Sequence, residues 1–270
     1  MYTRDNVALG QANIPFTSQE EATKGCPRLV RSKVGKVTVW SLRTYMALFF
    51  KAGMAIDADG APNAYHPQNT GLDYLANAGY PAKTGKRPWG IVTNGAGTPI
   101  VQGTGDPFPG YFVSPTSLTD TSRPVTDPRR YVDSTQIPYI ALPGAPAKKF
   151  GVKLGDFAAV YYGKTGKLSY AIFADVGPAG KLGEGSIALA RALGHEPLVA
   201  GKVRQGIPAD VVYIVFPGSG NGRPRPIADI NSEGAKLFKE WGSFSRLNKC
   251  FPEYVIKGGW PKPSRTEMYA

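Results

Sequence analysis

Short apolar runs closed by glycine, proline or asparagine recur along most of the chain. Runs that alternate apolar with polar residues, or that are rich in β-branched and aromatic residues, are typical of β-strands. Asn94-Gly95 and Gly163-Lys-Thr-Gly166 have the composition of hairpin turns. The predicted strands are 34–40, 90–93, 99–102, 111–114, 137–142, 156–162, 168–174 and 211–216.

Three segments between these strands predict short helices. They are residues 41–50, with Ser41 as a cap, residues 187–193, with Ser186 as a cap, and the amphipathic residues 233–241. Many short strands with few helices predict a mainly β protein with short helices, an α+β fold around a compact β-barrel core. The polar residues before the first strand, 1–33, are expected to form an extended arm.

The composition narrows the classes of protein and of partner. Hydrophobic residues make up 42% of the 270-residue chain, enough to form a core, and no apolar run is long enough to span a membrane. The net charge of +12 favours an anionic partner. Among anionic partners we expect nucleic acid least, because the basic residues do not interleave with aromatic residues in a binding motif. The excess charge lies near the two ends, and residues 51–145 are neutral.

The chain has two cysteines, Cys26 and Cys250, which lie near its opposite ends. They form either one disulfide or two thiols, and their spacing fits no metal site. The first six residues lack the basic and then apolar pattern of a signal peptide. Either a signal was removed, or export uses another route, or the protein is intracellular; of these we expect an exported or extracellular protein.

Two carboxylates stand at a turn that follows an apolar strand. Asp175 comes where the strand ends, and Glu184 lies between two glycines just before a predicted helix. Two carboxylates that face each other across a cleft can act as general acid and general base on a glycosidic bond. From the residue types alone, a turn-capping Asp175 and a solvated Glu184 are the more common interpretation.

A second polar cluster follows the predicted helix 41–50. It begins like a calcium loop, but no glutamate follows at the required distance. The two histidines of the chain have no nucleophile motif around them, and they predict neither a catalytic triad nor a zinc site. We interpret the cluster either as an Asx-rich turn or as a sugar-binding loop. Its candidate substrate-binding residues are Asp57, Asp59, Asn63, Tyr65, His66 and Asp73.

Five motifs, in this order, carry a resemblance to a known family. They are Asp57-Ala-Asp-Gly-Ala-Pro-Asn-Ala-Tyr-His-Pro67, Asp127-Pro-Arg-Arg-Tyr-Val-Asp133, Tyr170-Ala-Ile-Phe-Ala-Asp-Val-Gly-Pro178, Gly183-Glu-Gly-Ser186 and Phe216-Pro-Gly-Ser-Gly220. Over roughly residues 51–220 the chain resembles glycoside hydrolase family 75, the fungal-type chitosanases. The resemblance implies endo-hydrolysis of β-1,4-linked glucosamine polymers with inversion at the anomeric carbon.

The resemblance also assigns the catalytic pair, which falls on Glu184 as the acid and Asp175 as the base. It implies no metal and no organic cofactor, and by analogy with other inverting glycosidases it implies a double-psi type of barrel. We expect a monomer made of an N-terminal arm, strand and helix over 1–50, a catalytic domain over 51–220, and a basic C-terminal extension over 221–270 that packs on the same domain.

The positive charge leaves other functions open, because chitosan is itself a polycation that a basic protein repels. One alternative is a hydrolase of an anionic wall glycan such as peptidoglycan, delivered by a phage or a contact-dependent system. Another is a non-catalytic module that binds the cell wall through the same groove.

Overall fold

The computed structural model describes residues 20–23, 25–42 and 47–254. Their central feature is a closed β-barrel of six strands, which confirms the predicted mainly β fold with short helices. The double-psi connectivity stays a prediction. In their order around the barrel the strands are β4 (Leu48–Asp57), β11 (Ile207–Val215), β6 (Phe157–Tyr162), β7 (Lys167–Gly177), β5 (Tyr139–Pro143) and β8 (Glu184–Ser186), and β8 pairs back with β4.

Alternating side chains of the barrel strands feed two hydrophobic cores. In β11, Val211 and Tyr213 belong to the core that also holds residues of α1 (Gly144–Lys149) and α2 (Ile187–Ala192). Val212 and Ile214 face the other core, against α3 (Ile227–Trp241) and α4 (Ser243–Cys250). Successive side chains of a strand point to opposite faces of the sheet. Because both faces of β11 are buried here, these residues form a continuous apolar run.

The N-terminal segment differs from the predicted arm and helix. β1 (Glu20–Thr23), β2 (Cys26–Val34) and β3 (Val37–Leu42) extend the sheet from the edge of β4 by antiparallel pairing. The helix predicted over 41–50 is wrong, because Ser41 and Leu42 end β3 and Leu48 begins β4; residues 43–46 lie outside the described residues. The segment forms strands because the cross-strand pairing of Trp40 with Phe49 outweighs the helix-capping preference of Ser41.

The second half of the chain agrees more closely with the predictions. β6 and β7 form the predicted hairpin, and α2 begins at Ser186, whose hydroxyl accepts a hydrogen bond from the Leu189 N–H. α3 begins at Ile227, one turn and more before the predicted start. α4 was not predicted, and a disulfide joins its Cys250 to Cys26 of β2. None of the described helices is long and apolar enough to cross a membrane.

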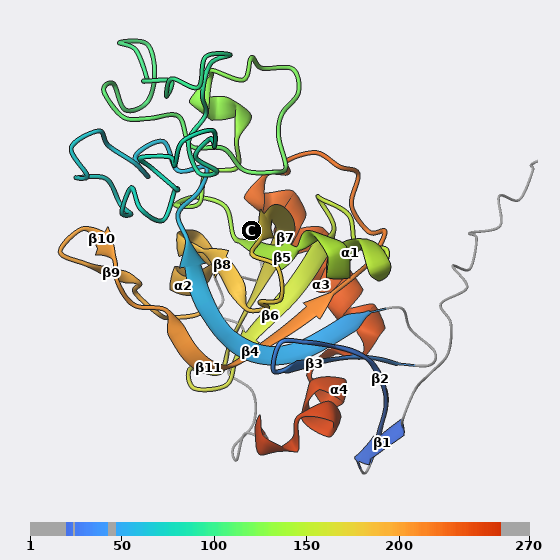
Figure 1. Cartoon of the computed structure of the whole chain (residues 1–270). Helices are drawn as coiled ribbons and strands as arrows, with labels where there is room; N and C mark the ends of the chain where they lie inside the picture. Colours follow the sequence, from blue (N-terminus) through green and yellow to red (C-terminus); the bar gives the residue numbers. More distant parts are fainter. Residues whose placement is uncertain (1–19, 24, 43–46, 255–270) are drawn as a thin grey trace, which may run out of the picture.

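Residues 58–136 form a largely irregular loop region beyond the carboxyl end of β4 (Figure 1). The strands predicted over 90–93, 99–102 and 111–114 are reduced to single bridges between Thr93 and Pro99 and between Val101 and Phe112. These segments are too short, and too often interrupted by glycine and proline, to form a ladder. The turn at Asn94-Gly95 does form, since the Asn94 N–H donates to the Thr98 carbonyl.

The remaining elements are small and lie at the margins of the barrel. They are the 3₁₀ turns η1 (Pro128–Arg130) and η2 (Pro252–Tyr254), and a two-stranded ribbon of β9 (Leu198–Val199) and β10 (Lys202–Val203). The loop region has a small core of its own, which includes Tyr65, Ile91 and Phe112. The division of the chain at residues 50 and 220 stays a prediction, and β4 runs across the first of these boundaries.

Candidate active site

A cleft of about 670 Å³ lies where the ends of β4, β7 and β8 meet the loop region. Five carboxylates and one lysine line it, so the cleft is acidic although the whole chain is basic. It contains six of the eight residues that the sequence singled out as catalytic or substrate-binding. The polar and aromatic lining residues are Asp57, Asp59, Tyr65, Asp73, Asn77, Trp89, Asp175, Lys181 and Glu184.

Asp175 and Glu184 lie on opposite sides of one residue of the barrel. Ala141 of β5 pairs with Asp175 of the parallel strand β7 and with Glu184 of the antiparallel strand β8. The β5–β7 register shifts between Ile140 and Ala141, so that Asp175 takes the position that an unbroken ladder would give to Ala174. Two strand spacings separate the backbones of the two acids, or about 10 Å.

Asp175 is held in place by Ser117 of the loop region. The Ser117 N–H and hydroxyl both donate to Asp175 Oδ1, at 2.8 and 2.6 Å, and the Ser117 hydroxyl accepts from the Val176 N–H at 3.2 Å. Burial raises the pKa of Asp175, while the two hydrogen bonds from Ser117 oppose this rise because they stabilise the ionised form. The two donors of Ser117 therefore fix the orientation of the carboxylate and stabilise its negative charge.

Glu184 has different surroundings. Its Oε2 lies against the backbone of Gly177, where a Cβ atom would approach it to 2.6 Å, so a side chain at this position would displace the carboxylate. Burial raises the pKa of Glu184 and so does the charge of Asp175, whereas the charge of Lys181 lowers it. Among the described residues, no donor forms a hydrogen bond to the carboxylate of Glu184. Its protonated form is therefore more favoured than the protonated form of a glutamate in water.

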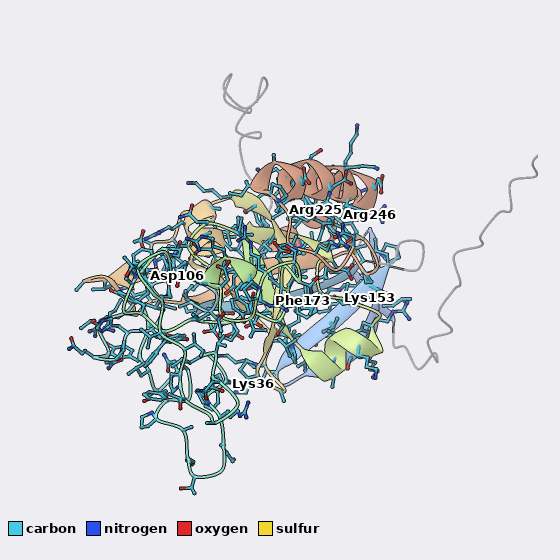
Figure 2. The ribbon with its side chains drawn as sticks, turned by 90° about the horizontal axis from the view of Figure 1, so that it is seen from above. Lys36, Asp106, Lys153, Phe173, Arg225 and Arg246 are labelled. Atoms are coloured by element: carbon cyan, nitrogen blue, oxygen red, sulfur yellow. A yellow bond between two sulfur atoms is a disulfide. The ribbon has the colours of Figure 1, made fainter. Side chains whose placement is uncertain are left out.

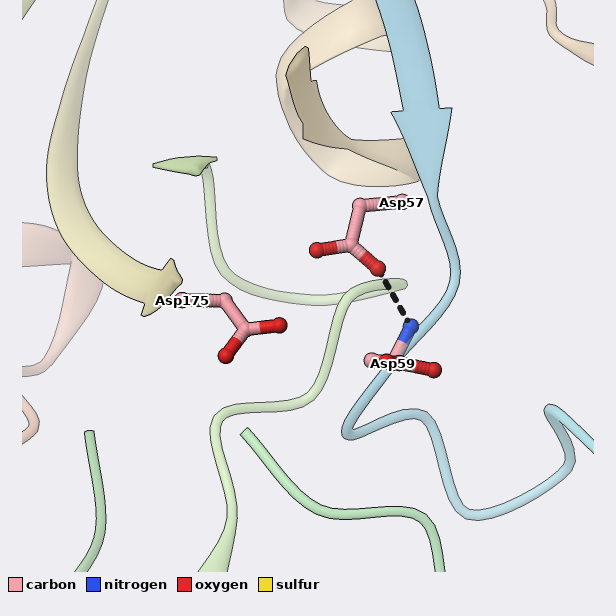
Figure 3. A group of neighbouring side chains, drawn as sticks. All are labelled: Asp57, Asp59 and Asp175. Atoms are coloured by element: carbon pink, nitrogen blue, oxygen red, sulfur yellow. Dashed lines mark hydrogen bonds between the residues drawn. The ribbon is translucent and has the colours of Figure 1, made fainter. Parts of the chain in front are cut away.

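Asp57 and Asp59 complete a compact acidic group beside Asp175 (Figure 3). One ligand oxygen from each of the three side chains lies within 4.8 Å of the others, and the Asp59 N–H donates to Asp57 Oδ1 at 2.9 Å. Burial, with the charges of Asp59, Asp175 and Glu184, raises the pKa of Asp57 well above its ordinary value. These three residues are the described group that could hold a metal ion; equally, they could share protons, because three such close carboxylates cannot all ionise.

Asp59 is anchored by Tyr65, whose phenol donates to Asp59 Oδ1 at 2.7 Å, and by the Ser114 hydroxyl at 3.3 Å. Burial and the charge of Asp175 raise the pKa of Asp59 to about 7, against the two hydrogen bonds. Tyr65 is itself buried, so its contact with Asp59 points to positioning of this carboxylate.

Asp73 lies at the loop end of the cleft. Its Oδ1 accepts from the Tyr74 N–H at 2.7 Å and from the Asn77 amide at 2.8 Å. Burial raises the pKa of Asp73, while these two hydrogen bonds and the charge of Lys202 lower it.

Two of the predicted substrate-binding residues do not line the cleft. The imidazole of His66 packs against Tyr111 and accepts from the Gln68 N–H, and the Asn63 carbonyl accepts from the Leu72 N–H. Both residues therefore organise the loop. The sequence reasoning missed Ser117, Asn77, Trp89 and Lys181, which lie in irregular segments where no periodicity shows which way a side chain points.

Comparison with known proteins agrees with this site. The family model for the fungal chitosanases of glycosyl hydrolase group 75 matches residues 54–249, which include every carboxylate of the cleft. The match runs beyond the motifs noted in the sequence, through α3 and most of α4. No curated protein matches the chain. The matched region covers well over half of the chain, which therefore belongs to the glycosyl hydrolase group 75 family and is a chitosanase-like glycoside hydrolase.

Proposed function

We propose that the protein cleaves chitosan at internal β-1,4 bonds between glucosamine units, by single displacement with inversion at the anomeric carbon. Membership of the chitosanase family supports the substrate. The observation that carries the mechanism is the placement of Asp175 and Glu184 on either side of Ala141, facing one cleft. Their backbone spacing of about 10 Å suits the carboxyl separation of roughly 6.5–9.5 Å that leaves room for a water molecule.

In this mechanism Glu184 is the general acid and donates its proton to the glycosidic oxygen as the bond to the anomeric carbon breaks. A water molecule attacks this carbon from the opposite face, and Asp175 accepts a proton from the water. The surroundings suit these roles, because Ser117 stabilises an ionised Asp175 and burial favours a protonated Glu184. Exchange with solvent then returns each carboxyl group to its starting state. This reaction requires no metal and no organic cofactor.

The charge distribution supports a cationic substrate in spite of the net charge. The cleft has five carboxylates and one lysine, and the basic residues labelled in Figure 2, such as Lys36 and Lys153, are not among the residues that line it. A local acidic field can attract the ammonium groups of chitosan at short range, where screening by salt leaves distant charges with little effect.

Two further properties belong to the proposal. The disulfide between Cys26 and Cys250 supports an exported or extracellular location, because such bonds persist in oxidising compartments. We also expect the enzyme to act as a monomer on the polymer.

The net charge of +12 favours a second candidate, the hydrolysis of an anionic wall glycan such as peptidoglycan. The five carboxylates of the cleft weigh against it, since they would repel acidic groups of such a substrate. A non-catalytic wall-binding module is the remaining alternative.

One experiment separates these functions. Purified protein is incubated with chitosan, with chitin and with peptidoglycan, and new reducing ends are measured together with the size of the products. We expect reducing ends from chitosan alone and a rapid fall in polymer length. Proton NMR of the first products should show the α-anomer; a β-anomer would contradict inversion. Release from peptidoglycan alone would favour the second candidate, and binding without cleavage would favour the module.

A further inference from the structure

Trp89 is the most exposed large hydrophobic residue of the described chain, with 71% of its surface accessible, and it lines the cleft that contains the catalytic carboxylates. An exposed tryptophan costs free energy in water, and such residues commonly mark a binding surface. Most of this side chain is accessible to solvent, and its place in the cleft puts it in the path of a bound polymer.

The exposed ring is nevertheless held in a fixed orientation. Its Nε1 donates to the Asn77 carbonyl at 2.7 Å, and the Trp89 backbone N–H donates to the Ala78 carbonyl at 3.1 Å. The indole lies directly on the backbone of Gly79, where a Cβ atom would come within 2.5 Å of the ring. A ring that is fixed before binding loses little conformational entropy when a ligand packs on it.

The ring is joined to the acidic part of the cleft by short contacts. The residue after it, Gly90, lies beside Asp59, since a Cβ atom on Gly90 would be 3.1 Å from Asp59 Oδ1. Asn77, whose carbonyl holds the indole, donates from its side chain to Asp73 Oδ1 at 2.8 Å. An aromatic face, an amide and a carboxylate therefore converge at one end of the cleft.

Asp59 links this end of the cleft to the proposed catalytic pair. One of its carboxylate oxygens lies within 4.8 Å of an oxygen of Asp175, while its Oδ1 faces Gly90, the residue after Trp89. Asp59, Trp89, Asp175 and Glu184 all line the same cleft. A polymer that crosses Asp175 and Glu184 extends toward Trp89.

We propose that Trp89, Asn77 and Asp73 form a subsite that binds one unacetylated glucosamine unit of the polymer away from the bond that is cut. The indole face packs on the sugar ring and attracts its ammonium group, and the Asp73 carboxylate pairs with that group. An N-acetyl group removes the cation, so Asp73 loses its ionic contact with the ligand and the subsite discriminates against acetylated units. This inference rests on the proposed cleavage of chitosan.

The first test is kinetic and compares Trp89→Ala with Trp89→Phe and with Phe108→Ala. Phe108 is a matched control, because it is 40% exposed and does not line this cleft. On fully deacetylated chitosan, Trp89→Ala should raise KM about tenfold with little change in kcat, while Trp89→Phe recovers most of the loss. A Trp89→Ala enzyme whose KM equals that of Phe108→Ala would overturn the subsite.

The second test measures binding of glucosamine oligomers and of N-acetylglucosamine oligomers. In a Glu184→Gln background, the glucosamine oligomers should quench tryptophan fluorescence, and Trp89→Phe should abolish the quenching. Asp73→Asn keeps an acceptor for the Asn77 amide and should reduce the preference for deacetylated oligomers about tenfold. Equal affinity of the parent protein for both oligomers would also overturn the proposal. If the wild-type enzyme released no reducing ends from chitosan, the proposed function itself would fail, whatever the variants did.

Discussion

The carboxyl groups of Asp57 and Asp175 lie within 4.8 Å of each other, at the ends of strands that are not neighbours in the barrel. Burial and three nearby carboxylates favour the protonated form of Asp57, whose side chain in turn lowers the pKa of Asp175. We propose that a protonated Asp57 donates to Asp175 and orients the base, since their oxygens lie within 4.8 Å of each other. The substrate-binding role of Asp57 stays a prediction.

Replacement of Asp57 tests this role. Asp57→Asn retains an acceptor for the Asp59 N–H and a donor toward Asp175, so we expect kcat within about tenfold of the wild type. Asp57→Ala leaves Asp175 next to a gap and should lower kcat by about a hundredfold or more. The kcat values of the two variants test the donor role of Asp57, and circular dichroism checks that both variants fold. Equal loss in both variants would mean that Asp57 must ionise.

The catalytic pair is tested by Asp175→Asn and Glu184→Gln. Each change removes one proton transfer, and each should lower kcat by about a hundredfold to ten-thousandfold while the melting temperature stays close to that of the wild type. Glu196→Gln is a suitable control, because Glu196 is exposed and pairs with Arg191 away from the cleft. Near-normal turnover in either catalytic variant would refute the corresponding assignment.

Lys181 gives a prediction for the pH profile. Its charge lowers the pKa of Glu184, which must be protonated to act as the acid. Lys181→Met should raise this pKa, so the alkaline limb of the kcat profile should move to higher pH, while Lys181→Arg leaves it in place. The acidic limb, set by ionisation of Asp175, should move less. A shift of the alkaline limb to lower pH in Lys181→Met would show that another group is the acid.

The sequence predicted the strands that form the barrel wall better than it predicted the site. β6 is apolar throughout, β7 and β11 contain the continuous apolar stretches 170–174 and 211–215, and the β6–β7 hairpin has a clear turn signal. The motif that contains Asp175 and Glu184 identified the proposed catalytic pair. Their spacing across Ala141 was not predictable, because it depends on the return of β8 to close the barrel and on a register shift in β7.

The predictions failed where long-range contacts outweigh local signals. Ser41 has the chemistry of a helix cap, yet it pairs with Leu48 across a strand. His66 belongs to the same sequence cluster as Asp59, but it packs against Tyr111 and does not line the cleft, so its substrate-binding role stays a prediction. Trp89 stands in a segment of glycine and proline with no periodicity, so only the folded loop shows that it reaches the cleft.

Asp59 should make the protein less stable as the pH rises. Its pKa is raised from 3.8 to about 7 on folding, so between these values the folded state binds a proton that the unfolded state has lost. Stability therefore falls as the pH rises through this window. Asp59→Asn should stabilise the protein by about 2–4 kcal/mol at pH 8 and have little effect below pH 4. Urea unfolding at both pH values measures this, with Asp106→Asn, a half-buried residue that does not line the cleft, as the control. An equal effect at the two pH values would exclude the titration of Asp59 as its cause.

The disulfide should contribute to stability without affecting catalysis. Cys26 and Cys250 are both buried, are separated by 224 residues, and join β2 to α4. Figure 1 shows α4 on the side of the barrel away from the loop region. A cross-link over so long a loop restricts the unfolded chain strongly, so the double variant Cys26→Ala/Cys250→Ala should lose about 2–5 kcal/mol of unfolding free energy. Its kcat at 25 °C should equal that of the wild type.

Urea unfolding of the wild type with and without reductant provides the matched comparison. Reduction should lower the midpoint of the wild type and leave the double variant unchanged, since the variant has no disulfide to lose. Equal midpoints for the oxidised and reduced wild type would show that the β2–α4 contacts hold the ends of the chain together without the bond. These contacts include the hydrogen bond from Arg28 to the Cys250 carbonyl at 3.1 Å, and the packing of Phe251, the residue after α4, against Trp40 of β3 supports them.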